Sequence, residues 1–225
     1  MEWNPGHDCP LDERDHARPS WTCAPARRQM DATPSDTDLL AAARGGDERA
    51  FRLLVERYES AVASTVIGML GRGDEAEDVG QEVFIQLFRS LDRFRGEAAL
   101  GTYLRRIAMN LSLNALKRRR RMTWRFLSRD RSPEPLPEPA TDPADADGWQ
   151  AREHVRAAIA RLAPQHRSVV VLRMMDGCST REAAQILQVP EGTVMSRLSR
   201  AMKELEQHLG AYRRDNTSGR EAHDG

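Results

Sequence analysis

Residues 74–121 read DEAEDVGQEVFIQLFRSLDRFRGEAALGTYLRRIAMNLSLNALKRRRR, and this stretch decides the fold. Apolar residues recur at spacings of three and four along its first part, which predicts an amphipathic helix beginning at Asp74. The same spacing predicts a second helix from Tyr103 to Arg121. Residues 93–102 between them carry two glycines and no apolar period, which predicts a connecting loop. The stretch therefore predicts packed helices whose acidic and basic groups are set apart.

Charge is distributed unevenly along these two helices. Acidic side chains crowd the first turns of the first helix, and no Lys or Arg balances them between Asp74 and Phe88. Complementarity with the helix dipole explains the acids of the first turn, but it does not require Glu82. A docking face for a basic partner protein is therefore an interpretation at least as good as dipole complementarity alone.

Basic residues dominate the end of the stretch and the segment that follows it. Residues 117–131 contain eight basic residues and one acidic residue, with Trp124 and Phe126 interleaved. This density favours nucleic-acid binding over a solvated basic face. In the loop 93–102, arginine and aromatic side chains suit contact with single-stranded nucleic acid, and glycines allow close backbone approach. The alternative for the loop is an ordinary turn between helices.

The chain before residue 74 divides into an extension and two predicted helices. Residues 1–35 contain five prolines and no helical period, so we expect them to be disordered. Ser35 or Asp36 predicts the cap of one helix, Asp47 predicts the cap of the next, and the glycines in residues 71–73 end it. The His and Cys residues of the extension match no common zinc spacing, so a metal or redox site there is the less favoured alternative: His7, Cys9, His16 and Cys23.

The chain after residue 131 contains a linker and a second helical domain. Residues 132–148 hold five prolines and five acidic residues, which predicts an extended linker. A capping box, Ser179 with Glu182, predicts the start of a short helix in the domain that begins near Trp149. A turn at residues 189–192 precedes a helix with outward Ser and Arg residues near its start. This pattern predicts a helix-turn-helix that places its second helix in the DNA major groove; the alternative is a plain three-helix bundle.

The composition excludes several classes of protein. The sequence contains no glycine-rich phosphate loop and no catalytic constellation, and we expect His154 and His166 to be surface groups, so we do not expect an enzyme. No cofactor or metal is expected. No run of about 18 apolar residues occurs, which predicts no membrane insertion, and no apolar signal core is present, which predicts a cytoplasmic protein. Three scattered cysteines do not make a disulfide framework.

The order of these parts resembles the extracytoplasmic-function sigma factors, the smallest two-domain members of the sigma-70 family of bacterial RNA polymerase subunits. The resemblance rests on GDERAFRLLVERY (46–58), DEAEDVGQEVF (74–84) and GTYLRRIAMNLSLNALKRRRR (101–121) in the first domain. In the second domain it rests on RLAPQHRSVVVLR (161–173) and EGTVMSRLSRA (191–201). Any one of these segments is a weak signal, but together they are highly specific.

The resemblance implies a role for each group of residues. It implies that the clamp helices of the largest core polymerase subunit dock on Asp74, Glu77, Asp78, Gln81 and Glu82. It implies that the minus-ten promoter element is bound by Arg93, Phe94, Arg95, Thr102, Tyr103, Arg106, Asn110, Asn114, Lys117 and Arg118. It implies that the minus-thirty-five element is read by Thr180, Glu191, Thr193, Met195, Ser196, Arg197, Ser199, Arg200 and Lys203. The polymerase flap and an anti-sigma factor are further implied partners.

The expected fold is all-α, with two small helical domains joined by a flexible linker. We expect a disordered extension (1–35), a sigma region 2 domain (36–121), a basic-then-acidic linker (122–148), a sigma region 4 helix-turn-helix domain (149–210) and a disordered tail (211–225). The expected function is that of an alternative sigma factor, which binds core polymerase and initiates transcription at particular promoters. The alternative is a helix-turn-helix regulator that binds DNA without polymerase, usually as a symmetric dimer.

Overall fold

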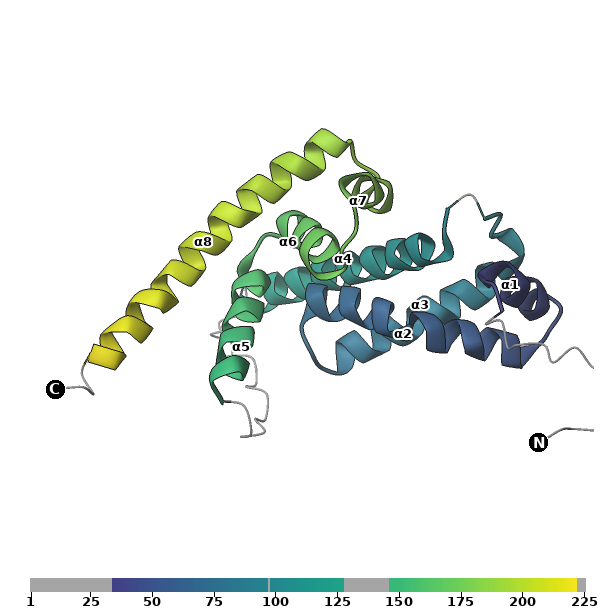
Figure 1. Ribbon diagram of the computed structural model, residues 1–225, viewed down its shortest axis with the longest axis horizontal. Coiled ribbons are helices and arrows are strands. Elements are labelled where there is room, and N and C mark those ends of the chain that lie inside the picture. Colours follow the sequence, from purple (N-terminus) through teal and green to yellow (C-terminus); the bar gives the residue numbers. More distant parts are fainter. Residues whose placement is uncertain (1–33, 97, 128–145, 222–225) are drawn as a thin grey trace, which may run out of the picture. The chain divides into compact units, whose positions relative to one another are not determined.

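The computed structural model describes residues 34–96, 98–127 and 146–221, with backbone alone for 125–127, 146–150 and 211–221. Within these residues the fold is all-α, as predicted (Figure 1). The helices are α1 (Asp36–Arg44), α2 (Glu48–Leu70), α3 (Asp74–Ser90), η1 (Leu91–Arg93), α4 (Leu100–Leu127), α5 (Ala146–Arg161), α6 (Pro164–Val170), η3 (Val171–Met175), α7 (Thr180–Leu187) and α8 (Glu191–Glu221). The predictions for residues 1–33, including the His and Cys residues there, lie outside the described residues.

Local side-chain chemistry sets the starts of the helices. The Ser35 hydroxyl accepts a hydrogen bond from the amide of Asp38, and the Asp47 carboxylate accepts two from the first turn of α2. Both predicted caps are therefore confirmed, and caps of this kind are typically worth about 1 kcal/mol each. The capping box is also confirmed, because Ser179 and Glu182 each accept a hydrogen bond from the other's backbone amide. Gly71, at φ +82°, ends α2 where the glycines predicted a stop.

The amino-terminal half packs α2 against α1, α3 and α4. Its largest fully buried side chains come from three of these helices: Leu54, Met69, Leu87, Leu104 and Met109. The apolar residues that recur at helical spacing in the sequence thus form the helix faces that pack together in this core. Figure 1 shows α2, α3 and α4 running alongside one another. Glu75, at the start of α3, contacts Arg118 and Arg119, beyond the middle of α4.

The carboxyl-terminal half packs α5 and α6 against α8, with α7 beside the start of α8. Ile159, Leu162 and Leu205 lie in its core. Gln188, in the left-handed conformation at φ 54°, ends α7. Only residues 188–190 separate α7 from α8, so the two helices form a tight helix-turn-helix. Val155 of α5 and Met202 of α8 are apolar but exposed, at 43% and 45%. In α8 the buried residues are Val194, Ala201 and Leu205, which define its inward face.

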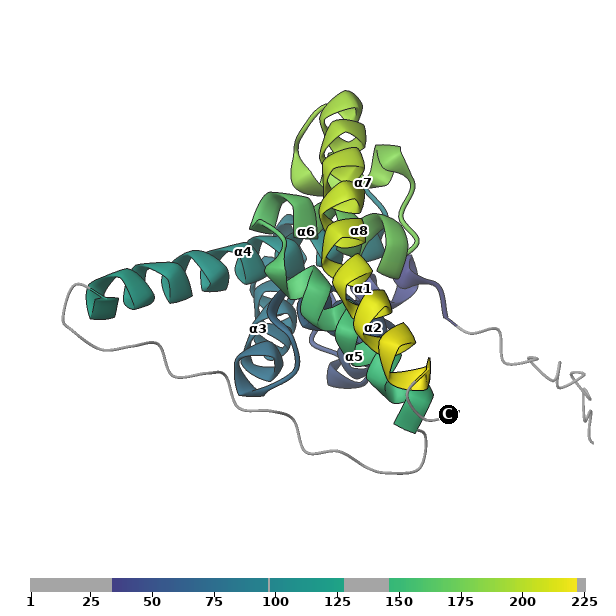
Figure 2. The ribbon, with the colours of Figure 1, turned by 90° about the vertical axis from the view of Figure 1, so that its left-hand side faces the viewer.

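Two helices are longer than predicted. α4 begins at Leu100 and continues to Leu127, so residues 122–127, predicted as linker, are helical (Figure 2). α8 continues to Glu221, so most of the predicted disordered tail is helical. In both cases the prediction ended the helix where the apolar pattern ended. No proline interrupts either extension. Met122, Arg125 and Leu127 are good helix formers, which favours the continuation of α4.

Candidate nucleic-acid and partner interfaces

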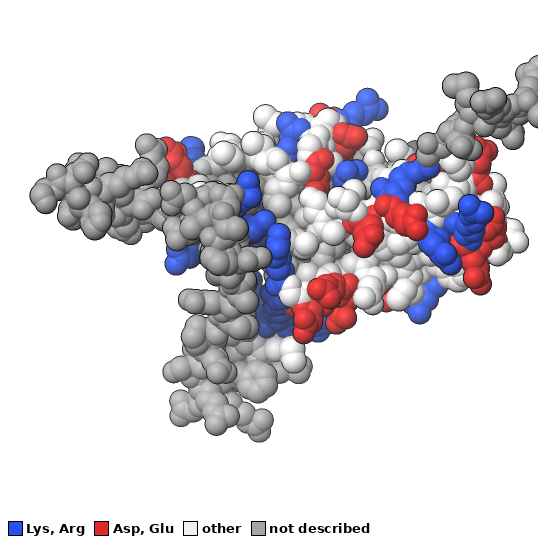
Figure 3. All heavy atoms as spheres, turned by 60° about the horizontal axis from the view of Figure 1, so that its bottom comes forward, with Lys and Arg blue, Asp and Glu red and all other residues white. Residues whose placement is uncertain are grey.

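The acidic residues of α3 form part of one helix face. Gln81 and Glu82 lie three and four residues after Asp78, and Ile85 lies four and three residues after them on the same face. Asp74, Glu77, Asp78 and Gln81 are exposed, and Glu82 is half-buried, 3.7 Å from the Arg89 guanidinium. On the face shown in Figure 3, acidic and basic side chains form adjoining patches.

The acidic face of α3 has an apolar end that sequence reasoning missed. Ile85 is 42% exposed and Phe88 is 61% exposed, although both lie in a helix that packs on the core. The Phe88 ring contacts the Phe51 ring of α2 edge-to-face, with centroids 5.2 Å apart. Exposed apolar side chains next to exposed acids make a surface suited to a protein partner, since buried interface centres are apolar and their rims polar.

Glu75 lies apart from that face and binds the basic helix instead. Its carboxylate accepts a hydrogen bond from Arg118 Nη2 at 2.8 Å and another from Arg119 Nε. Burial raises the pKa of Glu75, but the two guanidinium groups outweigh it and hold the pKa below its usual value. Arg118, predicted to bind DNA, is therefore already engaged within the protein, while still 67% exposed.

A pocket forms where the loop after η1 meets the start of α4. Its volume is about 570 Å³, and six of the residues predicted to bind the minus-ten element line it: Arg93, Phe94, Arg95, Thr102, Tyr103 and Arg106. The structure thus brings together side chains that the sequence distributes over 14 positions. The lining also includes Glu182 and Gln185 of α7, which the sequence did not place there.

Aromatic and cationic groups in this pocket are held in place by their neighbours. The Phe94 and Tyr103 rings lie 4.9 Å apart, and the Arg106 guanidinium stands over the Tyr103 ring at 5.3 Å. The Tyr103 hydroxyl donates to Ser90 Oγ at 3.0 Å. Arg44 of α1 donates to the carbonyl oxygens of Leu91 and Phe94, and so fixes the loop backbone. Arg44 is a supporting residue that no sequence pattern had indicated.

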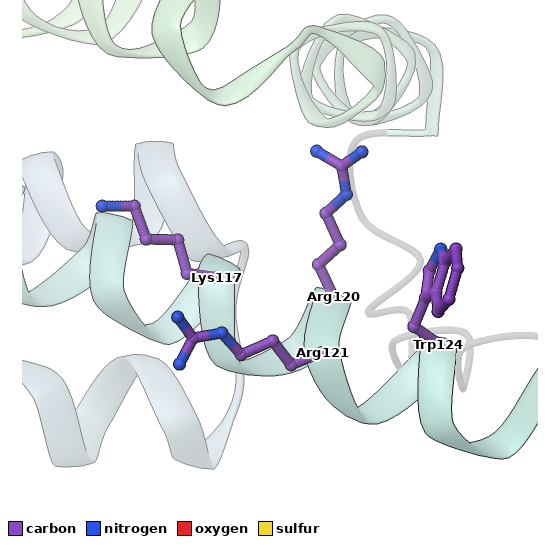
Figure 4. A pocket seen from close by; sticks show the side chains of 4 residues that line it. All are labelled: Lys117, Arg120, Arg121 and Trp124. Carbon is purple, nitrogen blue, oxygen red and sulfur yellow. The ribbon is translucent and has the colours of Figure 1, made fainter.

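The remaining minus-ten candidates continue along α4 as one stripe. Asn110, Asn114 and Lys117 are all exposed and recur at spacings of four and three beyond the pocket. The same spacing continues to Arg121 and Trp124, so the stripe from Tyr103 runs for about 32 Å of helix. Near its end, Lys117, Arg120, Arg121 and Trp124 line a second hollow of about 400 Å³. Figure 4 shows Arg120 and Trp124 rising from the same side of the helix.

The predicted recognition helix presents a polar face. Glu191, Met195, Ser196, Ser199, Arg200 and Lys203 are exposed along the first turns of α8, while Val194 and Ala201 are buried on its opposite side. Thr193 and Arg197 are half-buried. Thr180, at the start of α7, contacts this face through Met195, with 3.7 Å between Oγ1 and Sδ. The structure therefore places all nine candidates at or beside the first half of α8.

One histidine differs from its predicted place. His166 is 7% exposed, not a surface group, and its Nδ1 lies 2.8 Å from the Glu204 carboxylate. The packing of α6 on α8 buries this side chain, which the sequence pattern of α6 alone does not reveal. His154 is exposed, as predicted. Cys178 is buried, and burial raises the pKa of its thiol.

Comparison with known proteins identifies the family. The model of sigma-70 region 2 matches residues 54–122, and the model of sigma-70 region 4 matches residues 152–205. The chain is 34% identical over 191 residues to the ECF RNA polymerase sigma-E factor of Escherichia coli K12, covering 76% of this chain and 93% of the relative. The chain belongs to the sigma-70 family, in its extracytoplasmic-function group. It is also 32% identical over 190 residues to the RNA polymerase sigma-H factor of Pseudomonas aeruginosa, covering 77% of this chain and 93% of that protein.

Solved structures agree with this family. The chain is similar to CnrH in complex with the cytosolic domain of CnrY, with a TM-score of 0.55, 28% identity, and coverage of 77% of this chain and 96% of that one. The fold is also that of the sigma factor RpoE in complex with the anti-sigma factor NepR from Bartonella quintana, with a TM-score of 0.55 at 23% identity, covering 71% and 96%. Members of this family are regulators of transcription, and this chain is an alternative sigma factor that initiates transcription. Among the described residues, no helix is long and apolar enough to cross a membrane.

Proposed function

We propose that the two halves of this sigma factor divide promoter recognition, the pocket at the start of α4 capturing the minus-ten element and α8 reading the minus-thirty-five element. The observation that carries this proposal is the convergence of six predicted minus-ten residues on one pocket. We expect the protein to act in the cytoplasm, where polymerase works.

The pocket suits an unstacked base of a single DNA strand. The Phe94 and Tyr103 rings give an aromatic wall, and Arg106 beside them adds a positive charge. Stacking a base on an aromatic side chain is worth about 1–3 kcal/mol. Taking a base out of a duplex costs a few kcal/mol. The capture of bases can therefore offset most of the cost of opening the duplex without ATP.

The stripe along α4 suits the phosphates next to that strand. Asn110 and Asn114 can donate hydrogen bonds, and Lys117, Arg120 and Arg121 supply positive charge at the far end. Phosphate contacts of this kind give affinity without sequence preference and release counterions. We therefore extend the predicted minus-ten surface beyond Arg118 to Arg120, Arg121 and Trp124.

The face of α8 suits base edges in the major groove. Arg200 and Lys203 extend from its exposed side, and the exposed Ser199 lies beside them. Arginine pairs with guanine through two hydrogen bonds, and serine contacts either a base or a phosphate. Ser196 already donates to the backbone oxygen of Thr193, so its hydroxyl is left to accept. We therefore assign base reading mainly to Arg200 and its neighbours.

The acidic face of α3 suits core polymerase, and we assign the clamp helices of the largest subunit as its partner. The polymerase flap is the proposed partner of the carboxyl-terminal half. Ile85 and Phe88 supply an apolar contact, and the acids around them select a basic surface. An anti-sigma factor is the further partner we propose, because the similar structures of CnrH and RpoE are complexes, and the RpoE partner is named as an anti-sigma factor.

The test is transcription with purified components. The chain and core polymerase together should initiate at specific sites in a genomic library, and neither should do so alone. A gel shift on the promoters found should require core polymerase. Tight binding of a palindromic site by the chain alone, with no effect of polymerase, would favour the helix-turn-helix regulator and contradict the proposal.

A further inference from the structure

An apolar side chain interrupts the polar face of α8. Met195 is 53% exposed, and two of its neighbours on this face, Ser196 and Ser199, are polar and exposed. The core does not use Met195, because α8 buries Val194 and Ala201 on its other side. A single exposed methionine is ordinary on a protein surface, so exposure alone assigns it no function.

Met195 differs from an ordinary surface methionine because its sulfur atom is tethered. The Thr180 hydroxyl donates to this sulfur, with 3.7 Å between Oγ1 and Sδ. Thr180 is the first residue of α7, and the capping box of Ser179 and Glu182 fixes the backbone there. α7 packs beside the start of α8, so both ends of the tether belong to one packed unit (Figure 1). A thioether is a weak acceptor, but the contact selects among the many conformations of a side chain with three rotatable bonds.

The residues that share a side of α8 with Met195 do not suit the DNA backbone. Glu191 and Ser199 lie four residues before and after it, and both are exposed. The Glu191 carboxylate repels phosphate, and a methionine side chain has no hydrogen-bond donor. The donors for phosphate and guanine, Arg200 and Lys203, lie toward the other flank of the exposed face. Met195 is therefore placed for contact with a base rather than with the backbone.

The edges of the bases in the major groove offer one apolar group. Every base pair presents hydrogen-bond donors or acceptors there, and thymine alone adds a methyl group, which apolar side chains contact. Cytosine at the same place would present an amino group, and Met195 would remove it from water without replacing its hydrogen bond. The chemistry of Met195 therefore favours thymine over cytosine.

Helix geometry separates this contact from the one assigned to Arg200. Arg200 follows Met195 by five residues, which is about 7.5 Å along the helix axis and about 140° around it. Base pairs in B-form DNA are about 3.4 Å apart, so this distance corresponds to about two base pairs. Met195 comes earlier in α8, where recognition helices contact base edges.

We propose that Met195, positioned by Thr180, contacts the methyl group of a thymine in the upstream element, about two base pairs from the base that Arg200 contacts. The proposal rests on the assignment of α8 to the minus-thirty-five element. It makes Met195 a specificity-determining residue and Thr180 a positioning residue.

The test removes the methyl group from the DNA and the thioether from the protein. In a promoter found by transcription with core polymerase, each thymine of the upstream element is replaced in turn by deoxyuridine, which lacks only the methyl group. The complex of the full chain with core polymerase should bind one of these duplexes about fourfold more weakly, as expected for the loss of one buried carbon group. The complex with Met195→Ala should bind the thymine and deoxyuridine duplexes equally at that position.

Met202→Ala is the matched control. Met202 is also exposed, at 45%, and it follows Met195 by seven residues on the same side of α8. It lies about 10.5 Å further along the helix, beyond the first turns that contact base edges. The Met202→Ala complex should therefore distinguish thymine from deoxyuridine as the wild type does.

A second pair of variants tests the positioning role of Thr180. Thr180→Val removes the hydroxyl at nearly constant volume and should reduce the fourfold preference for thymine over deoxyuridine. Met195→Leu keeps an apolar side chain but has no sulfur to accept the hydrogen bond, so it should keep a preference for thymine. Addition of Thr180→Val to Met195→Leu should then change nothing further. An equal effect of Thr180→Val with and without Met195→Leu would overturn the positioning role.

Three outcomes would overturn the contact between Met195 and thymine. The first is an upstream element with no thymine on either strand, or with none that responds to deoxyuridine. The second is a preference for thymine that survives Met195→Ala, and the third is an equal loss of that preference in Met202→Ala. Equal binding of the promoter and of a duplex with a scrambled upstream element by the wild-type complex would instead overturn the proposed function.

Discussion

Single side chains decide how strongly the pocket at the start of α4 can hold DNA. Tyr103 contributes a ring to the pocket wall and a hydroxyl that donates to Ser90. Tyr103→Ala should weaken binding of the single-stranded minus-ten strand in the polymerase complex by about 1–3 kcal/mol, through loss of stacking. Tyr103→Phe keeps the ring and should bind nearly as the wild type does. Equal losses in both variants, measured by fluorescence titration, would show that the hydroxyl and not the ring matters.

Arg200 should carry sequence information at the upstream element. Its replacement by alanine should cost about 1–3 kcal/mol on the correct sequence, because a bidentate pair with guanine is worth that much. On a scrambled upstream sequence the loss should be much smaller. A competition assay with the two duplexes separates the outcomes, and an equal loss on both would mean that Arg200 contacts phosphate only.

Glu75 gives the domain a pH dependence of known sign. Its pKa is lowered in the folded state, so the ionised carboxylate adds to the free energy of unfolding at pH values above the unfolded pKa of about 4.5. This stabilisation is lost as the pH falls below that value and through the folded pKa. Glu75→Gln should therefore destabilise the chain at pH 7, by at most about 1 kcal/mol because the arginines are exposed. The difference in free energy of unfolding between the variant and the wild type, measured by urea unfolding, should disappear as the pH falls below about 4.5. A difference that stays constant with pH would contradict the ion-pair assignment.

At the scale of helices, α3 should carry polymerase affinity. Asp78→Arg with Glu82→Arg reverses the charge of the docking face and should abolish binding of core polymerase, while helical content is retained. Glu56→Arg with Glu59→Arg makes the same change of charge on exposed positions of α2 and is the control. Unchanged affinity of the α3 variant in a pull-down with core polymerase would remove α3 from the interface.

The sequence allowed the helices to be predicted where local chemistry defines them. Ser35, Asp47 and the Ser179–Glu182 box could be identified as caps because each bonds within three residues of itself. The ends of α4 and α8 could not, since an apolar period marks burial and not helix length. Buried polar groups were missed for a related reason. His166 and Arg167 are buried by partners 38 and 98 positions away, Glu204 and Met69, which no local pattern reveals.

At the scale of the whole molecule, the candidate site was predictable in its residues but not in its surroundings. Six minus-ten candidates do line one pocket, because they flank a single loop and a helix start. Glu182 and Gln185 joined them only through packing between the halves. A pattern of apolar residues shows that Val171 is buried, but it does not show that Gly68 is what Val171 packs against. The same residue types would suit a chain whose halves never touched.

The division of promoter recognition between two halves makes a prediction about spacing. When polymerase holds both halves, the DNA-binding surface of each half has a fixed position and orientation relative to the promoter. Insertion of five base pairs between the elements moves the upstream element by about 17 Å and turns it by about half a helical turn. Run-off transcription should then fall to the level of a promoter without an upstream element. Full transcription from the longer promoter would mean that the halves move freely on polymerase, and that α8 does not position the start site.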